Sequence, residues 1–280
     1  MNQSSRWQSV AEMIRRVSSR RGRELTGLYS IEGTRLVERA LRAGAPLASV
    51  LAAKRFFDAP RGAALRDALQ EAGIAVVLAP PATVAALTEG RDLGQVLGLV
   101  RLPPPVTLEM IVTTNQRRVT GDVEPPPPLR SSAPLLLLAA VDIIDPGNVG
   151  ALTRTAHATG ATGLLVAGAS DPFHPRATRI SRGSIFRLPV VRYASAAALL
   201  ADLDRCGVIP VATAAEGGVL LPDLERPAGP VAVLVGNEAQ GLAPEVAAAV
   251  PLRVTIPMPE DVDSFSVNAA AAILLYTLHR

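Results

Sequence analysis

The sequence predicts an α/β protein in which a small α/β sandwich precedes a larger domain built on a mostly parallel sheet covered by helices. Three observations predict this fold. After residue 134, near-continuous apolar runs alternate with helical patterns, as expected for parallel strands buried on both faces. Residues 103–133 are rich in proline and interrupt this alternation. Before them, shorter strand and helix patterns alternate again.

The first domain is expected at residues 1–102, where we find no histidine and no pattern that indicates catalysis. Apolar periodicity and glycines that end helices set the expected elements. The expected strands are 28–32, 47–52, 74–78 and 96–101, and the expected helices are a basic amphipathic helix at 9–20 and helices at 33–43, 63–72 and 81–88.

Residues 103–133 are expected to form a linker, because their two proline clusters exclude a continuous helix or central strand. The second domain is expected at residues 134–280. It has no G-x-G-x-x-G after its first strand and no P-loop sequence, which excludes a standard dinucleotide or P-loop site. Its expected strands are 135–144, 163–167, 188–193, 208–213, 231–235 and 252–256, and its expected helices are 149–159, 177–186, 194–206, 244–250 and 264–278.

Composition indicates a globular chain, with 280 residues, 49% hydrophobic and 19% charged. Aromatic residues make up only 3%, so any nucleic-acid binding should depend on charge rather than on stacking. Residues 1–101 carry 15 Lys and Arg against 9 Asp and Glu, whereas residues 134–280 carry 10 against 13. The arginine excess fits a domain that docks a polyanion, and a GC-rich genome explains it about equally well.

Cys206 is the only cysteine, which excludes a disulfide framework and a cysteine-rich zinc site. We therefore expect no metal centre and a reducing compartment. The first 23 residues are polar and no apolar run approaches the roughly 18 residues that span a bilayer. The sequence thus predicts a cytoplasmic protein without membrane contact.

Three polar loops follow apolar, strand-like runs in the second domain: 145–150 leading to Arg154, 236–241, and 256–258 running into 264–268. Loops at the carboxyl ends of adjacent parallel strands converge on one crevice, so we expect one assembled site. In the first loop, Asn148 is expected to cap a helix. Arg154 is either a solvated charge or a contact to phosphate or ribose.

In the second loop, Gly236 and Gly241 permit a ligand to approach the backbone, and Glu238 is a possible acid or hydrogen-bond acceptor. A plain strand-to-helix turn explains this loop about as well. In the third loop, Ser264 is expected to cap the last helix. That helix is apolar on nearly every face, which indicates burial in the core or between subunits.

Taken together, N-V-G-A-L-T-R-T-A from Asn148, L-V-G-N-E-A-Q-G-L from Leu234, and I-P-M followed by S-F-S resemble the SpoU (TrmH-type) RNA ribose 2′-O-methyltransferases of the SPOUT superfamily. The segment at 171–184 belongs to the same resemblance. The first domain resembles the ribosomal-protein-like substrate-binding domain of many members, through G-L-Y-S-I-E-G-T-R-L-V.

This resemblance implies S-adenosylmethionine held in a C-terminal trefoil knot, a homodimer, and an RNA substrate. The scarcity of aromatics and the many arginines favour structured RNA, and so ribosomal RNA over tRNA. The residues implied at the cofactor are Gly236, Ile256, Pro257, Met258 and Phe265. Those implied in catalysis are Asn148, Arg154, Glu238, Ser264 and Ser266.

The chain departs from the family in its third motif, which usually reads S-L-N but here reads Ser264-Phe265-Ser266. Asn268 is a weaker candidate for the missing amide, because two residues along a helix turn it by about 200° from position 266. Two other functions stay open: an RNA-binding or ribosome-assembly protein with weakened catalysis, and a small-molecule enzyme with a basic accessory domain.

Overall fold

The computed structural model describes residues 3–91, 95–119 and 135–279. They fall into two compact units, of which the first contains Met1–Pro104 and Phe173–Phe186 and the second contains Pro105–Pro172 and Arg187–Arg280. The second half of the chain therefore contributes one short segment to the first unit.

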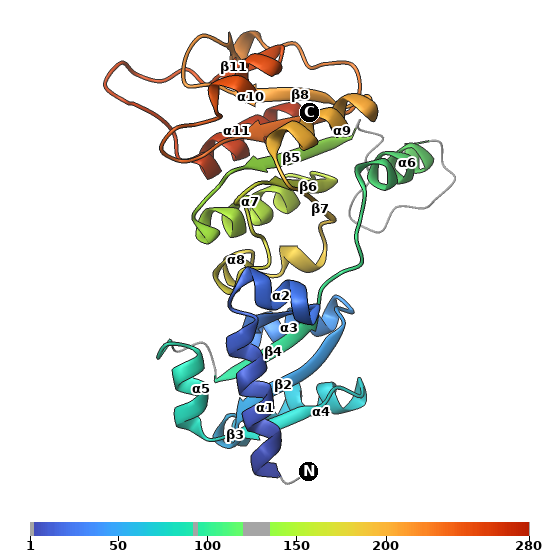
Figure 1. Cartoon of the computed structure of the whole chain (residues 1–280), viewed down its shortest axis with the longest axis vertical. Helices are drawn as coiled ribbons and strands as arrows, with labels where there is room; N and C mark the ends of the chain where they lie inside the picture. The colour runs from blue at the N-terminus through green and yellow to red at the C-terminus, as the bar shows by residue number, and fades with distance from the viewer. Residues whose placement is uncertain (1–2, 92–94, 120–134, 280) are drawn as a thin grey trace. The chain divides into compact units, whose positions relative to one another are not determined.

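The first unit is a four-stranded sheet in the order β1-β4-β2-β3, covered by helices (Figure 1). Only β2 and β3 run parallel, while β4 is antiparallel to both of its neighbours. Ala11 and Ile14 of helix α1, with Val17 just after its end, are buried against apolar side chains of β2, β3 and β4. The elements are α1 (Gln3–Arg16), α2 (Arg20–Thr26), β1 (Leu28–Glu32), α3 (Thr34–Arg42), β2 (Leu47–Ala53), a 3-10 helix (Lys54–Asp58), α4 (Pro60–Glu71), β3 (Val76–Ala79), α5 (Pro81–Leu87) and β4 (Val96–Arg101).

Two helices replace the single basic helix that was expected at 9–20. Helix α1 ends at Arg16, and the Ser19 side chain accepts the backbone N–H of Gly22 to begin α2. Gly27 ends α2 in the left-handed conformation with φ of 65°, which glycine adopts without strain. The Ser19 cap thus divides residues 9–20 between two helices, although their hydrophobic pattern suggests one.

The segment Phe173–Phe186 packs against β1 of the first unit, through α8 (Pro175–Ile180), and ends in a 3-10 helix (Ser184–Phe186). The ring of Phe173 lies 5.1 Å from that of Tyr29. Thr178 Oγ1 donates to the Ser30 carbonyl at 3.3 Å, and Arg179 pairs with Glu32. The prediction of one helix at 177–186 was wrong, because α8 ends at Ile180 and a separate 3-10 helix follows. The predicted domains follow the order of the sequence, whereas the contacts of this segment group it with the first unit.

The second unit is a fully parallel seven-stranded sheet in the order β7-β6-β5-β10-β8-β11-β9, with helices on its faces (Figure 1). The six expected strands are present, and the edge strand β9 is additional. The elements are α6 (Leu108–Val119), β5 (Leu136–Val141), α7 (Pro146–Ala158), β6 (Gly163–Ala167), β7 (Val190–Tyr193), α9 (Ala196–Arg205), β8 (Ile209–Thr213), β9 (Val219–Leu220), a 3-10 helix (Leu221–Asp223), β10 (Val231–Val235), α10 (Pro244–Ala249), β11 (Leu252–Thr255) and α11 (Val267–His279).

Part of the predicted linker belongs to this second unit. Helix α6 forms inside the stretch 103–133 and buries Leu108, Ile111 and Val112 in the same core as β5 and α9. In the sequence, the proline clusters lie before and after this helix and not within it. The high proline content of residues 103–133 as a whole therefore led to the prediction of a linker. Residues 120–133 of the predicted linker lie outside the described residues.

Helix α11 buries Ala271, Leu274, Leu275 and Leu278 and packs against α7, β5 and β10. Tyr276 on the same helix stays exposed. The expectation of burial in the core is therefore confirmed for one face of α11. None of the helices among the described residues is both long and apolar enough to cross a membrane.

Candidate active site

A pocket of about 580 Å³ opens at the carboxyl edge of the seven-stranded sheet. Its walls are the segments that follow β8, β10 and β11, together with the start of α11. These three strands are neighbours in the sheet, so their carboxyl ends meet at the same edge. The second and third polar loops of the sequence are thus brought into one site.

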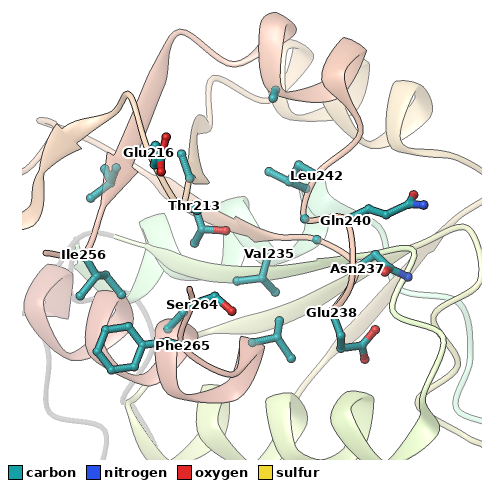
Figure 2. A pocket seen from close by; sticks show the side chains of 18 of the residues that line it. Thr213, Glu216, Val235, Asn237, Glu238, Gln240, Leu242, Ile256, Ser264 and Phe265 are labelled. Carbon is teal, nitrogen blue, oxygen red and sulfur yellow. The ribbon is translucent and has the colours of Figure 1, made fainter. Parts of the chain in front are cut away.

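Seven of the residues singled out in the sequence line this pocket: Gly236, Glu238, Gly241, Ile256, Met258, Ser264 and Phe265. Figure 2 shows Ile256 and Phe265 on one side of the pocket and the loop with Asn237, Glu238 and Gln240 on the other. Pro257, Ser266, Asn148 and Arg154 are outside the lining. The apolar side chains and the exposed loop backbone together suit a flat ligand with polar edges.

Gly236 is buried where the loop after β10 folds back on itself. A Cβ atom at this position would lie 2.3 Å from backbone atoms of Gly241 and Leu242, closer than real contacts allow. The loop is closed by an Asn237–Gly241 bridge, and Asn237 Oδ1 accepts the N–H of Ala239 at 2.9 Å. Only glycine fits here, and the backbone itself forms this wall of the pocket.

The first polar loop is joined to the second by two side-chain hydrogen bonds. Asn148 Nδ2 donates to Glu238 Oε1 at 2.7 Å, and Asn237 Nδ2 donates to the Asp142 carbonyl at 3.3 Å. Asn148 is not the helix cap that was expected. Asp145 caps α7 by accepting the N–H of Gly147 at 2.9 Å, which releases Asn148 to hold Glu238.

Arg154 lies exposed on α7, two turns beyond Asn148. Among the described residues, no hydrogen bond or ion pair engages its guanidinium. Its neighbours are engaged, since Thr153 donates to the Val149 carbonyl and Thr155 donates to Asn268. Arg154 is therefore a cation available to an outside ligand.

The third motif corrects the expectation that Ser264 caps the last helix. Helix α11 begins at Val267, and its cap is Ser266, whose Oγ accepts the N–H of Ala269 at 3.3 Å, rather than Ser264. Ser264 is left in the pocket lining. Asn268 Oδ1 accepts Thr155 Oγ1 at 2.8 Å and fastens α11 to α7.

Sequence reasoning missed the segment after β8, where Thr213 to Glu216 line the pocket. Thr213 Oγ1 donates to the Leu234 carbonyl of β10 at 3.1 Å, which fixes the two strand ends together. A threonine at the end of an apolar run was the available signal. The order of the strands, which places β8 between β10 and β11, could not be read from the chain. Among the described residues, no cluster of His, Cys, Asp or Glu could hold a metal ion.

Comparison with known proteins gives two family matches. A sequence model of the SpoU rRNA Methylase family matches residues 135–276, about half of the chain. A model of the MRM3-like substrate binding domain matches residues 12–91. The two matches divide the chain on either side of the proline-rich stretch.

Relatives and solved structures agree with these matches. The 23S rRNA (guanosine(2553)-2′-O)-methyltransferase RlmP of Bacillus subtilis is 26% identical over 94% of this chain and 93% of its own. The 23S rRNA (uridine(2479)-2′-O)-methyltransferase of Streptomyces viridochromogenes is 36% identical, over only 47% of each chain. The crystal structure of AviRb from S. viridochromogenes with AdoMet superposes with a TM-score of 0.79 at 26% identity, over 98% of this chain and 97% of AviRb.

The fold, the three motifs and the matches over both halves of the chain lead to one assignment. This protein belongs to the SpoU rRNA methylase family.

Proposed function

We propose that the protein transfers a methyl group from S-adenosylmethionine to a ribose 2′-hydroxyl of ribosomal RNA. The observation that carries this proposal is the pocket after β8, β10 and β11, bordered by the Asn148–Glu238 hydrogen bond, with the uncommitted Arg154 on α7. The names of RlmP and of the S. viridochromogenes relative support ribosomal RNA as the substrate class.

The pocket fits the cofactor in size and in chemistry. Its volume of about 580 Å³ lies within the range that holds ligands of this size. Ile256, Met258 and Phe265 offer apolar surface to the adenine ring, and the backbone around Gly236 offers hydrogen-bonding groups to its edges. Pro257 shapes the turn that presents its two neighbours. Bound there, the cofactor supplies an electrophilic methyl group on a sulfonium centre.

The chain's own residues position and polarise the ribose. A guanidinium stays protonated at neutral pH and is a poor base. Arg154 instead clamps the neighbouring phosphate and stabilises the negative charge that develops on the 2′-oxygen. The O–CH₃ bond forms as the S–CH₃ bond breaks, and the hydroxyl proton leaves to solvent. Positioning of this kind can contribute roughly 7 to 11 kcal/mol.

Glu238 and the serines of the third motif complete the proposed site. Asn148 holds one carboxylate oxygen of Glu238, which orients that side chain at the pocket wall. Ser264 lines the pocket and can hydrogen-bond the ribose or the cofactor. Ser266 sets the first turn of α11 and so the position of Phe265.

The same proposal includes the chain threading and the assembly implied by the family resemblance. We infer a trefoil knot in the C-terminal part of the second domain, and the packing of α11 on β5, β10 and α7 is consistent with it. We also infer a cytoplasmic homodimer, and the exposed Tyr276 of α11 and Ile144 before α7 are apolar positions suited to a subunit contact. Light scattering at several concentrations tests the dimer.

Methyl transfer is tested by incubating the protein with ribosomal RNA, tRNA and tritiated S-adenosylmethionine. We expect label in ribosomal RNA, and nucleoside analysis should recover a 2′-O-methylated nucleoside. Label in tRNA alone would contradict the proposed substrate. Cofactor and RNA binding without any transfer would instead support the RNA-binding or ribosome-assembly function.

A further inference from the structure

The segment that follows β8, residues 213–218, is held to the two neighbouring strands of the sheet. Its first residue donates a side-chain hydrogen bond to β10. The N–H of Ala214 donates to the Val254 carbonyl of β11 at 2.9 Å, and the N–H of Gly218 donates to Thr255 Oγ1 at 3.1 Å. Both ends of the segment are therefore held in place by the sheet itself, without any contribution from a ligand.

Two glycines allow this segment to turn closely against β11. Gly217 has a φ of 72°, in the left-handed region that glycine adopts without strain. A Cβ atom on Gly218 would lie 2.8 Å from backbone atoms of Arg253, closer than real contacts allow. The turn directly follows Glu216, so it determines where the Glu216 side chain leaves the backbone.

Glu216 is the one charged residue of this segment, and its exposed side chain lines the active-site pocket. The residues before it, Ala214 and Ala215, carry no polar side-chain group. Among the described residues, no hydrogen bond or ion pair engages the Glu216 carboxylate, and this includes Arg253, the one basic residue of the lining. An ionised carboxylate accepts hydrogen bonds at two oxygens. Glu216 is therefore an acceptor available to a ligand in the pocket.

Glu216 lies on the side of the pocket to which the proposed function assigns the adenine ring. Its segment is bonded to Thr255, and Ile256 is the next residue along the chain. Figure 2 shows Glu216 on the same side of the pocket as Ile256, while the loop with Glu238 lies on the other side. An adenine ring that packs on Ile256 is therefore on the same side as the Glu216 carboxylate.

The part of the cofactor next to its adenine is a ribose, and the methionine part lies beyond that ribose. The 2′- and 3′-hydroxyls of the ribose are adjacent donors, which suit the two oxygens of one carboxylate. An acidic side chain binds a ribose hydroxyl in the same way at dinucleotide sites. Resting on the proposed function, we propose that Glu216 binds the cofactor by accepting hydrogen bonds from its ribose hydroxyls.

The RNA backbone is a poor match for this carboxylate. Phosphate groups are negatively charged and offer acceptors, so a carboxylate without a cation repels them. The reacting 2′-hydroxyl of the RNA is assigned to the side of the pocket with Glu238, opposite Glu216. Loss of the Glu216 charge should therefore weaken binding of the cofactor and leave the affinity for RNA unchanged.

The test uses the full chain with Glu216→Gln, which keeps the size of the side chain and removes its charge. Glu245→Gln is the matched control, because Glu245 is an exposed glutamate of α10 outside the pocket lining. Calorimetry measures the affinity for S-adenosylmethionine and for 5′-methylthioadenosine, which contains the ribose but no amino acid. We expect Glu216→Gln to bind both ligands about tenfold more weakly, because hydrogen bonds to a charged group are lost. Glu245→Gln should bind both as the wild type does.

The two ligands distinguish the ribose from the methionine part of the cofactor. If Glu216→Gln loses affinity for S-adenosylmethionine but not for 5′-methylthioadenosine, Glu216 binds the ammonium group of the methionine part and the proposal is wrong. Melting temperatures should be equal in the wild type and both variants, because Glu216 and Glu245 are exposed. A lower affinity in Glu216→Gln is then not a consequence of unfolding.

Removal of a hydroxyl from the ligand tests the same contact from the other side. Adenosine, 2′-deoxyadenosine and 3′-deoxyadenosine are compared by their displacement of tritiated S-adenosylmethionine. The wild type should prefer adenosine to the deoxy compounds by about tenfold, and Glu216→Gln should lose most of this preference. An equal preference in the two proteins would overturn the assignment of Glu216 to the ribose.

The outcomes separate this inference from the proposed function. In steady-state kinetics, Glu216→Gln should raise KM for S-adenosylmethionine and leave KM for RNA at the wild-type value. If Glu216→Gln binds every ligand as the wild type does while both methylate RNA, the inference is wrong and the function stands. If the preference for ribose hydroxyls depends on Glu216 but the wild type methylates no RNA, the proposed function alone is overturned.

Discussion

Asn148 Nδ2 and Glu238 Oε1 lie 2.7 Å apart and join the first turn of α7 to the loop after β10. The two residues are 90 positions apart in the sequence. They come close because each follows a strand, β5 or β10, and these two strands are hydrogen-bonded neighbours. The contact determines where the Glu238 carboxylate points at the pocket wall. Its removal therefore has consequences beyond one hydrogen bond.

A double-mutant cycle with Asn148→Ala and Glu238→Ala should show coupling. A hydrogen bond to a charged group contributes about 1.5 to 3 kcal/mol, and solvent exposure here lowers that to about 1 kcal/mol. The free energy of unfolding from urea titrations measures the coupling. If the losses of unfolding free energy in the two single variants sum to that of the double variant within about 0.3 kcal/mol, the contact is not formed in solution.

Arg154→Ala should lower the rate of methyl transfer by about 100-fold or more, because the developing charge on the 2′-oxygen loses its cation. Affinity for S-adenosylmethionine, measured by calorimetry, should stay within about twofold, because Arg154 is outside the pocket lining. Arg205→Ala is the control, as an exposed arginine of the same unit that pairs with Asp202. Wild-type turnover in Arg154→Ala would remove Arg154 from the mechanism.

Gly236→Ala should abolish cofactor binding, since its Cβ would lie 2.3 Å from the backbone of Gly241 and Leu242. Gly241→Ala is the comparison, because a Cβ there meets no atom within 4 Å and bears only the strain of φ at 69°. That strain costs about 1 to 2 kcal/mol of stability. Calorimetric titration with S-adenosylmethionine should separate the two variants; equal affinities would contradict the role of Gly236.

Ser266→Asn restores the family's third motif and should raise methyl transfer without loss of stability, because asparagine also caps helices well. Asn268→Ala should instead lower stability by about 1 kcal/mol through loss of the Thr155 contact, and leave turnover at its original level. Turnover and melting temperature are measured for both. A loss of turnover confined to Asn268→Ala would show that Asn268 does serve as the missing amide.

Leu108→Ala on α6 should destabilise the protein by about 2 to 5 kcal/mol, because Leu108 is fully buried in the core of the second unit. Met110→Ala on the same helix is the control, since that side chain is 54% exposed. Urea unfolding compares the two variants. Similar urea midpoints for the two variants would mean that α6 does not pack on the core of the second unit.

Much of the fold follows from local pattern. Strands 28–32, 163–167 and 231–235 were predicted with the bounds that the structure shows, because apolar runs there are delimited by glycine or by turn residues. Helix starts were less predictable. Two serines, at 264 and 266, can each cap α11, and only the loop geometry around the pocket selects the second.

Other features depend on tertiary contacts that no local pattern encodes. Asn148 was predicted to cap α7 because asparagine is a common helix cap, yet the helix begins earlier and its cap is Asp145. The segment after β8 became part of the site only through the strand order. For the candidate site, the motifs therefore predicted which residues gather, while the sheet topology decided which of them face the pocket.

The assignment of Phe173–Phe186 to the first unit has a consequence for how this protein can be recombined. The chain passes between the units after Pro104, after Pro172 and after Phe186. A chimera joined only at the proline-rich stretch would give the substrate-binding sheet a foreign α8, and so would replace the residues that contact Glu32 and Tyr29 from Arg179 and Phe173. An exchange of RNA specificity between relatives should therefore transfer residues 173–186 together with residues 1–104, because the two segments fold as one unit although they are separate in the sequence.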